Sequence, residues 1–240
     1  MAATQEGSEL RREAHIRKQQ AIVLIEHSDR HFLPAAGRDV YLPLYDPLVS
    51  FMGASRARDE LVKQASIQPN QRVLDLGCGT GTLVVLLKRK YPAAQIVGLD
   101  PDPKALRRAQ KKVRRAGVEV QLDEGFADEL PYDEGTFDRV LSSFMFHHLE
   151  DLDREKMLRE VLRVLKPAGE FHLLDFAGGE DRARGRWGRL VDSHAHLEGN
   201  SQRRILELMR RAGFVNPEKV KDGSMLFGLM PTAYYQAGAG

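Results

Sequence analysis

One run of this sequence has the composition of a nucleotide-binding loop, Val73-Leu74-Asp75-Leu76-Gly77-Cys78-Gly79-Thr80-Gly81, and an acid, Asp100, follows 25 residues after Asp75. Glycine tolerates positive φ and leaves no Cβ in the way of a ligand. A glycine-rich turn between a strand and a helix presents free N–H groups, and a carboxylate at the end of the next strand can accept both hydroxyls of a ribose. The spacing therefore predicts a nucleotide-binding site.

Three further side chains could move or orient a proton. His147 and His148 follow the apolar run Phe137–Ser143, and Asp175 ends the run Glu170–Asp175. Histidine is the commonest general base, and an aspartate can orient a histidine or a substrate. Structural roles stay open beside these: the histidines could cap or pack the next helix, and Asp175 could make a structural hydrogen bond.

Alternating strands and helices are needed to position these residues, and the apolar pattern supplies them from residue 71 onward. The expected strands are Arg72–Leu76, Gln95–Leu99, Val118–Leu122, Phe137–Ser143, Glu170–Asp175, Phe214–Val220 and Met225–Tyr235. The expected helices are Arg56–Ser66, Thr82–Tyr91, Pro103–Ala116, Asp153–Leu165 and Ser201–Ala212. This order predicts a Rossmann-like, doubly wound α/β fold with a mostly parallel seven-stranded sheet, helices on both faces and ligands beyond the carboxyl ends of the strands.

The glycine spacing separates two classes of nucleotide ligand. A dinucleotide fingerprint, G-x-G-x-x-G, requires glycine at position 82, where this chain has Thr82. The chain has G-x-G-x-G instead, preceded by Asp75 and followed by Asp100. This combination resembles the class I methyltransferases that depend on S-adenosylmethionine (SAM) and release S-adenosylhomocysteine.

The resemblance implies a set of SAM contacts. Asp75 and the region of Gly77 would face the methionine end, and Asp100 would bind the ribose. The other implied contacts along the loop and the strand ends are Cys78, Gly79, Thr80, Gly81, Pro101 and Ser142.

The resemblance extends from about Gln71 to Asp175 and includes two later segments. Gly125–Asp138 and Leu165–Glu170 resemble the ubiquinone/menaquinone-type branch, whose members act mainly on small molecules. The chain departs from the family at Phe126, where an acid usually accepts from the adenine amino group. We expect Phe126 to contact the adenine ring face, with backbone groups around Ala127 holding its edge.

Two segments are expected to cover the site. In the family, a segment upstream of the loop can fold over SAM, which predicts an N-terminal helical lid over 1–66, with Tyr41 and Tyr45 at the cofactor, in front of a core over 67–240. The stretch 178–200 is the expected cover of the substrate pocket. Ordinary hydrophobic docking of the N-terminal segment is the alternative to a lid.

Composition limits the other function classes. The formal charge of +2 over 240 residues gives no reason to expect nucleic acid. The single cysteine, Cys78, excludes an internal disulfide, and we interpret it as a small loop residue rather than a nucleophile. His194 and His196 lack a third ligand of clear spacing, so no metal is expected. No apolar run approaches the roughly 18 residues that span a bilayer, and the charged N-terminus has no signal-peptide pattern, so we expect a cytoplasmic protein.

The sequence thus favours a SAM-dependent methyltransferase that acts on a small molecule by in-line displacement at O, N, S or C. A protein or RNA methyltransferase is one alternative, although Ser142-Ser143-Phe144-Met145 stands where an amino-methyltransferase would carry Asn/Asp-Pro-Pro-Tyr/Phe. A SAM-binding protein without activity is the other alternative. The acceptor, the need for a general base and the oligomeric state, a homodimer included, are left open.

Overall fold

A computed structural model of the protein describes residues 53–178 and 200–240. Tyr41, Tyr45, most of the lid expected over 1–66 and most of the cover expected over 178–200 lie outside these residues, so the expectations about them stay predictions. No helix within the described ranges is long and apolar enough to cross a membrane.

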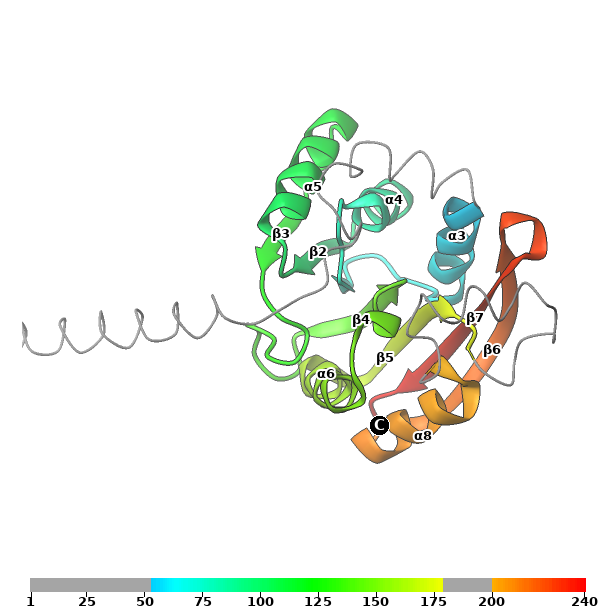
Figure 1. Ribbon diagram of the computed structural model, residues 1–240. Helices are drawn as coiled ribbons and strands as arrows, with labels where there is room; N and C mark the ends of the chain where they lie inside the picture. The colour runs from blue at the N-terminus through cyan, green and yellow to red at the C-terminus, as the bar shows by residue number, and fades with distance from the viewer. Residues whose placement is uncertain (1–52, 179–199) are drawn as a thin grey trace, which may run out of the picture. The chain divides into compact units, whose positions relative to one another are not determined.

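A single seven-stranded sheet, in the order β3-β2-β1-β4-β5-β7-β6, forms the centre of the fold (Figure 1). Its strands are β1 (Arg72–Leu76), β2 (Gln95–Asp100), β3 (Gln121–Glu124), β4 (Phe137–Ser143), β5 (Leu165–Phe176), β6 (Val215–Met225) and β7 (Met230–Gly238). Strands β1 to β5 run parallel, and β7 is antiparallel to β5 and to β6. The predicted Rossmann-like, mostly parallel sheet is confirmed.

Helices cover both faces of the sheet because successive strand side chains point to opposite sides. The α-helices are α3 (Ser55–Gln64), α4 (Thr82–Lys90), α5 (Pro103–Ala116), α6 (Asp151–Val164) and α8 (Gln202–Ala212). Two short 3₁₀ turns, η3 (Phe146–His148) and η6 (Leu226–Gly228), join other elements. Val73 of β1 faces the cluster of α3, α4 and α5, whereas the next residue, Leu74, faces that of α6 and α8 (Figure 1).

Three strands, β3, β6 and β7, are displaced from their expected positions. β3 starts at Gln121 rather than Val118, because Gly117 ends α5 in the left-handed region and the Val118 N–H bonds back to the Val113 carbonyl. Val118 and Val120 then pack against the core without pairing as a strand. β6 continues to Met225 and β7 begins only at Met230, because most of β6 is exposed and lacks the alternating apolar pattern that marks a half-buried strand.

The third glycine of the loop allows α5 to approach the start of α4. Gly81 precedes α4 with φ 79°, and a Cβ built on it would lie 2.8 Å from Ala109 Cβ and 3.0 Å from Ala109 Cα. Both neighbouring atoms belong to the rigid part of α5, so they cannot move aside as a flexible side chain would. Glycine is therefore required at position 81 for its φ and for its small volume.

Replacing Gly81 with alanine should cost more stability than replacing Gly117, which has a similar φ of 64° but no described atom within 4 Å of a built Cβ. We expect Gly117→Ala to lose about 1 kcal/mol from backbone strain and Gly81→Ala to lose about 1–3 kcal/mol more from overpacking. Urea unfolding of both variants measures the difference. Equal losses would show that the contact with Ala109 carries no cost.

Candidate active site

The glycine loop is bonded to the end of β2. The Gly77 and Cys78 N–H groups both donate to the Leu99 carbonyl, at 2.9 and 3.0 Å. Gly77, Gly79 and Gly81 have φ values of 74°, 52° and 79°, as expected for a loop that needs glycine. A Cβ built on Gly79 meets no described atom within 4 Å. The loop is therefore rigid at its base and open at its middle glycine.

Asp100 joins the loop to the start of α5. Its Oδ2 accepts a hydrogen bond from the Gly79 N–H at 2.8 Å, and its Oδ1 accepts from the Asp102 N–H at 3.0 Å. Burial raises the pKa of Asp100. The two backbone bonds leave each oxygen able to accept one more hydrogen bond, which is the geometry that a pair of ribose hydroxyls requires.

Asp75, at the end of β1, is a fully buried carboxylate. Among the described residues neither oxygen has a donor in full hydrogen-bonding geometry, and the Val84 N–H is only close enough to lower the pKa of Asp75 slightly. Burial raises its pKa to about 7, the nearby Arg58 guanidinium opposes this rise, and the charge of Asp100 adds to it. Buried polar groups in folded proteins almost always have a hydrogen-bond partner, so this carboxylate is a candidate to bind a ligand or a water molecule.

Arg58 of α3 is a site residue that the sequence analysis missed. Its Nε donates to Ser143 Oγ at 3.4 Å, and its guanidinium lies 5.4 Å from the centre of the Phe144 ring. One signal could have found it, because the buried side of α3 has the helical spacing of Ala54, Ala57, Leu61 and Ala65. Arg58, four residues after Ala54, lies on the same side of the helix and is partly buried, a position where an arginine is unusual.

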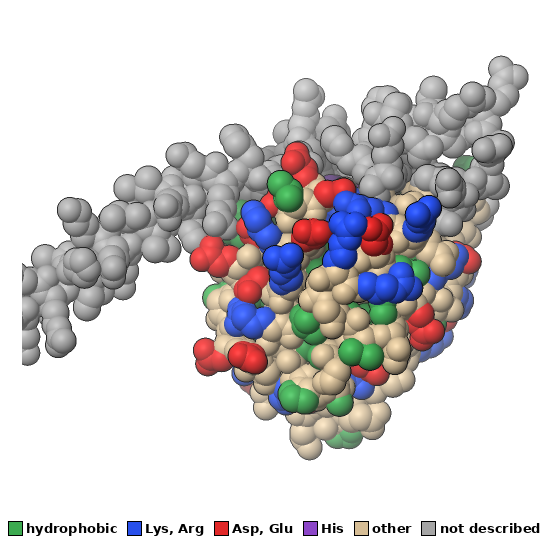
Figure 2. Space-filling model, turned by 90° about the horizontal axis from the view of Figure 1, so that it is seen from below, with side chains coloured by type: hydrophobic (Ala, Val, Ile, Leu, Met, Phe, Trp, Pro, Cys, Tyr) green, Lys and Arg blue, Asp and Glu red, His purple; other side chains and the backbone are tan. Residues whose placement is uncertain are grey.

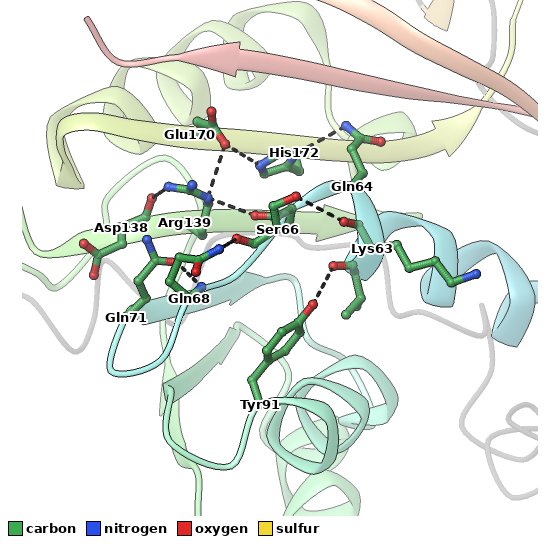
Figure 3. A network of polar contacts seen from close by, with 12 residues as sticks. Lys63, Gln64, Ser66, Gln68, Gln71, Tyr91, Asp138, Arg139, Glu170 and His172 are labelled. Carbon is green, nitrogen blue, oxygen red and sulfur yellow. Dashed lines mark hydrogen bonds and ion pairs between the residues drawn. The ribbon is translucent and has the colours of Figure 1, made fainter.

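A polar network at the other end of α3 fixes the helix that carries Arg58 (Figure 3). Gln64 Nε2 lies 3.3 Å from His172 Nδ1 and donates to the Tyr235 carbonyl at 3.1 Å. Arg139 Nε donates to the Ala65 carbonyl at 3.0 Å and lies 3.2 Å from Glu170. These contacts attach the end of α3 to β4, β5 and β7.

His147 and Asp175, nominated separately from the sequence, lie in direct contact. His147 Nδ1 is 2.7 Å from Asp175 Oδ1, and the His147 backbone N–H donates to Asp175 Oδ2 at 3.0 Å. Asp175 Oδ1 also accepts from the Phe176 N–H at 2.7 Å. A neutral His147 ring that donates from Nδ1 keeps its Nε2 as a proton acceptor, which is the state of a general base.

Two aromatic contacts surround this pair. The His148 ring stacks on the His147 ring at 3.9 Å between centres, and Phe176 meets His147 edge-on at 5.0 Å. Phe144 lies 5.1 Å from Phe176 and adopts a left-handed φ of 57°. A bulky residue in that conformation is strained, and such strain clusters at functional sites.

The other nominated residues lie around the same strand ends. Gly125 donates its N–H to the Asp100 carbonyl at 3.3 Å, which brings the Phe126–Ala127 loop to the end of β2, and Pro101 follows Asp100 directly. Ser142 is fully buried beside Leu76 at the end of β4. Lys112 of α5 donates to the Thr80 hydroxyl at 3.2 Å. Their contacts to a cofactor stay predictions.

Two other chemical roles, a cysteine nucleophile and a metal site, depend on Cys78 and on clusters of ligating side chains. Burial raises the pKa of the Cys78 thiol, so the thiol is protonated near neutral pH, as suits a small loop residue rather than a nucleophile. Within 53–178 and 200–240, no three side chains of His, Cys, Asp or Glu gather as a metal site. His194 and His196 lie outside those ranges.

Known proteins similar to this chain share both its sequence and its fold. A family model described as a methyltransferase domain matches residues 73–169. A demethylmenaquinone methyltransferase of Thermus thermophilus is 39% identical over 137 residues, covering 56% of this chain and 61% of the relative. The demethylmenaquinone methyltransferase of Deinococcus radiodurans is 31% identical over 196 residues, which cover 72% of this chain and 80% of the relative. The chain spans 55–61% of the length of the first three curated relatives it matches.

A solved structure gives the fold independently. Phosphoethanolamine N-methyltransferase 2 of Haemonchus contortus, in complex with S-adenosyl-L-methionine, superimposes with a TM-score of 0.65 at 18% identity, covering 76% of this chain and 52% of that one. The match to the Deinococcus relative over four fifths of its length agrees with this fold and with the motifs of the loop. The chain belongs to the class I SAM-dependent methyltransferases, in their ubiquinone/menaquinone branch.

Proposed function

We propose that this protein transfers the methyl group of SAM to a small-molecule acceptor. The observation that carries the proposal is Asp75, a fully buried carboxylate without a described partner, beside a glycine loop that Asp100 closes. An unpaired buried carboxylate is costly to the folded chain, and a cationic ligand group offsets that cost. SAM carries such a group in the ammonium of its methionine end.

The residues of the site fit the parts of SAM in turn. Asp75 would receive the ammonium, and Arg58, close enough to lower the pKa of Asp75, would complement the carboxylate of the same methionine end. Asp100 would accept from the ribose hydroxyls while Gly79 leaves room beside it. The Phe126–Ala127 loop, attached through Gly125 to Asp100, would hold the adenine. Bound SAM supplies an electrophilic methyl group on a sulfonium.

The protein itself would contribute a general base, His147, and two aromatic side chains, Phe144 and Phe176, that line the site. His147, held by Asp175 through Nδ1, would take a proton from the acceptor at Nε2, and His148 packs against it. Phe144 and Phe176 would exclude water from the acceptor. A protonated acceptor group such as a hydroxyl or an ammonium needs this base.

The acceptor class rests on the relatives. The curated relatives include demethylmenaquinone methyltransferases and a sarcosine/dimethylglycine N-methyltransferase of Halorhodospira halochloris, all named for small molecules. A protein or RNA acceptor stays the alternative. The cytoplasmic location that we propose rests on the sequence pattern, and a homodimer is left open.

The proposal is tested by following a labelled methyl group from SAM into small-molecule and macromolecular fractions of an extract. We expect label in a small molecule with S-adenosylhomocysteine released in equal amount. In His147→Asn the amide N–H can still donate to Asp175, but the imidazole that would accept the proton is gone. We therefore expect kcat to fall by about 10²–10⁴-fold with an unchanged affinity for SAM. His148→Asn compares the second candidate histidine of the same turn, and we expect a smaller loss of kcat there because its ring packs against His147 and is not the proposed base.

Label found only in protein or RNA would contradict the small-molecule proposal. A His147→Asn variant with the kcat of the wild type would remove His147 as the base and leave the proposed transfer itself standing.

The raised pKa of Asp75 predicts a stability that depends on pH. Burial raises the pKa of Asp75 to about 7, whereas an aspartate of the unfolded chain ionises near 4. Between these values the unfolded chain has lost the proton and the folded chain keeps it, so the ligand-free protein loses stability as pH rises from about 4 to 7. Asp75→Asn should therefore melt higher than the wild type at pH 8 and equally at pH 4.

Asp138→Asn is the matched control, because its carboxylate has the opposite shift. Hydrogen bonds from Lys166 and from the Arg72 N–H outweigh burial and lower the pKa of Asp138. Its contribution to stability is present above about pH 4 and is lost as pH falls through the lowered pKa, so Asp138→Asn should melt lower than the wild type at pH 8. A difference between Asp75→Asn and the wild type that is the same at every pH would contradict the assignment.

A further inference from the structure

We propose that Arg154, a buried arginine of α6, positions the general base His147 and connects it to the surface of α8 through a line of alternating charges. The inference rests on the proposed function, because it concerns how His147 is held for proton transfer. Arg154 was not predicted from the sequence as a site residue, and it contacts the His147 turn from α6, whereas Asp175 contacts the same turn from β5.

Arg154 holds the turn that carries His147. Its side chain is 3% exposed, its Nε donates to the Phe146 carbonyl at 3.2 Å, and its guanidinium lies 5.0 Å from the centre of the Phe146 ring. Phe146 directly precedes His147 in η3. Asp175 of β5 bonds to the ring and backbone of His147, so the turn is held from the sheet by a carboxylate and from α6 by a guanidinium.

The charges around Arg154 alternate in sign from the surface to the base. Arg204 of α8 lies 2.8 Å from Asp151 Oδ2, and Asp151 Oδ1 lies 3.5 Å from Arg154 Nη1. Burial lowers the pKa of Arg154, and the carboxylates of Asp151 and Asp175 oppose that effect. The line runs from Arg204, which is 31% exposed, through Asp151 and Arg154 to the fully buried Asp175.

Arg204 and Asp151 form the surface end of this line of charges. Figure 2 shows a face of the molecule on which positive and negative side chains are intermixed. Further pairs join α6 to α8 there, including Arg211 with Glu155 at 3.9 Å. The exposed pairs contribute little stability individually, about 0–1 kcal/mol. The pair at the inner end, Asp151 with Arg154, connects these charges to the His147 turn through the bond from Arg154 to the Phe146 carbonyl.

A purely structural role would not require an arginine here. Arg154 continues the helical spacing of Met157, Leu158 and Val161, which are buried against the sheet. An apolar side chain at that position would fill the space without the cost of burying a charge. The guanidinium adds two things that an apolar side chain lacks, a donor to the Phe146 carbonyl and a positive charge near Asp175.

The test compares three single variants of the full chain. Arg154→Met keeps an unbranched apolar stem without the guanidinium or its charge, and Arg154→Lys restores the charge. Asp151→Asn removes an exposed carboxylate without touching the core. The readouts are the ¹⁵N and ¹H resonances of the His147 ring, assigned through His147→Asn, together with kcat and the affinity for SAM.

We expect Arg154→Met to shift the Nδ1–H resonance of His147 and to lower kcat at least tenfold with an affinity for SAM within threefold of the wild type. Arg154→Lys should recover most of both. Asp151→Asn should shift the same ring resonance in the same direction by a smaller amount. A folded Arg154→Met with an unchanged ring spectrum and kcat overturns the inference, and if that variant fails to fold, an unchanged ring spectrum in Asp151→Asn overturns it.

The two proposals fail in different ways. A His147 ring signal that depends on Arg154 in a protein that transfers no methyl group would support the positioning role and contradict the proposed function. Methyl transfer that requires His147 but is indifferent to the charge at position 154 would support the function and contradict the positioning role.

Discussion

The hydrogen bonds between the glycine loop and the end of β2 are the constraint on which the rest of the site depends. Leu99 accepts from two loop N–H groups, and Asp100 accepts from a third. Because β1 and β2 are adjacent parallel strands, these bonds set the distance between Asp75 and Asp100. Gly81 then begins α4 against α5, so the same loop also fixes the packing of two helices.

The site contains charged side chains at positions where an apolar side chain would cost the folded protein less stability. Asp75 lacks a well-formed hydrogen bond within the described residues. Arg154, which is buried, and Arg58, which is partly buried, each occupy a position of an otherwise apolar helical spacing. Burying such groups costs stability unless a partner compensates their charge. Asp175 and Asp151 compensate Arg154 within the chain, whereas Asp75 has no comparable hydrogen bond among the described residues and is the carboxylate that we propose for a ligand. This difference separates the residues that shape the site from those that would hold the cofactor.

Local pattern predicted the elements whose apolar residues recur clearly. β1, β4 and α5 have the expected bounds. Asp100 ends β2 as the pattern predicted, whereas its hydrogen bond from the Gly79 N–H was not predicted. β3 and β6 were misplaced, because a helix cap and an exposed edge strand changed the expected pattern.

Contacts between distant elements could not be predicted in the same way. His147 and Asp175 were both nominated, but their contact depends on the register of β4 with β5, which pairs Ser143 with Leu174. Arg58 and Arg154 belong to no motif. The signal in the sequence is a cation at a position of an otherwise apolar helical spacing. It becomes informative once the structure places Arg58 at Ser143 and Arg154 at Phe146, both near the end of β4.

Calorimetric titration of SAM into the wild type and into Asp100→Asn tests the central claim most directly. The asparagine keeps the size of the side chain and loses the charge that would bind the ribose hydroxyls. Asp102→Asn serves as the neighbouring control, because asparagine also caps a helix. We predict that the wild type binds SAM and that Asp100→Asn binds about 10–100-fold more weakly, with Asp102→Asn close to the wild type. Equal affinity of the wild type and Asp100→Asn, or no binding of SAM by the wild type, would contradict the account.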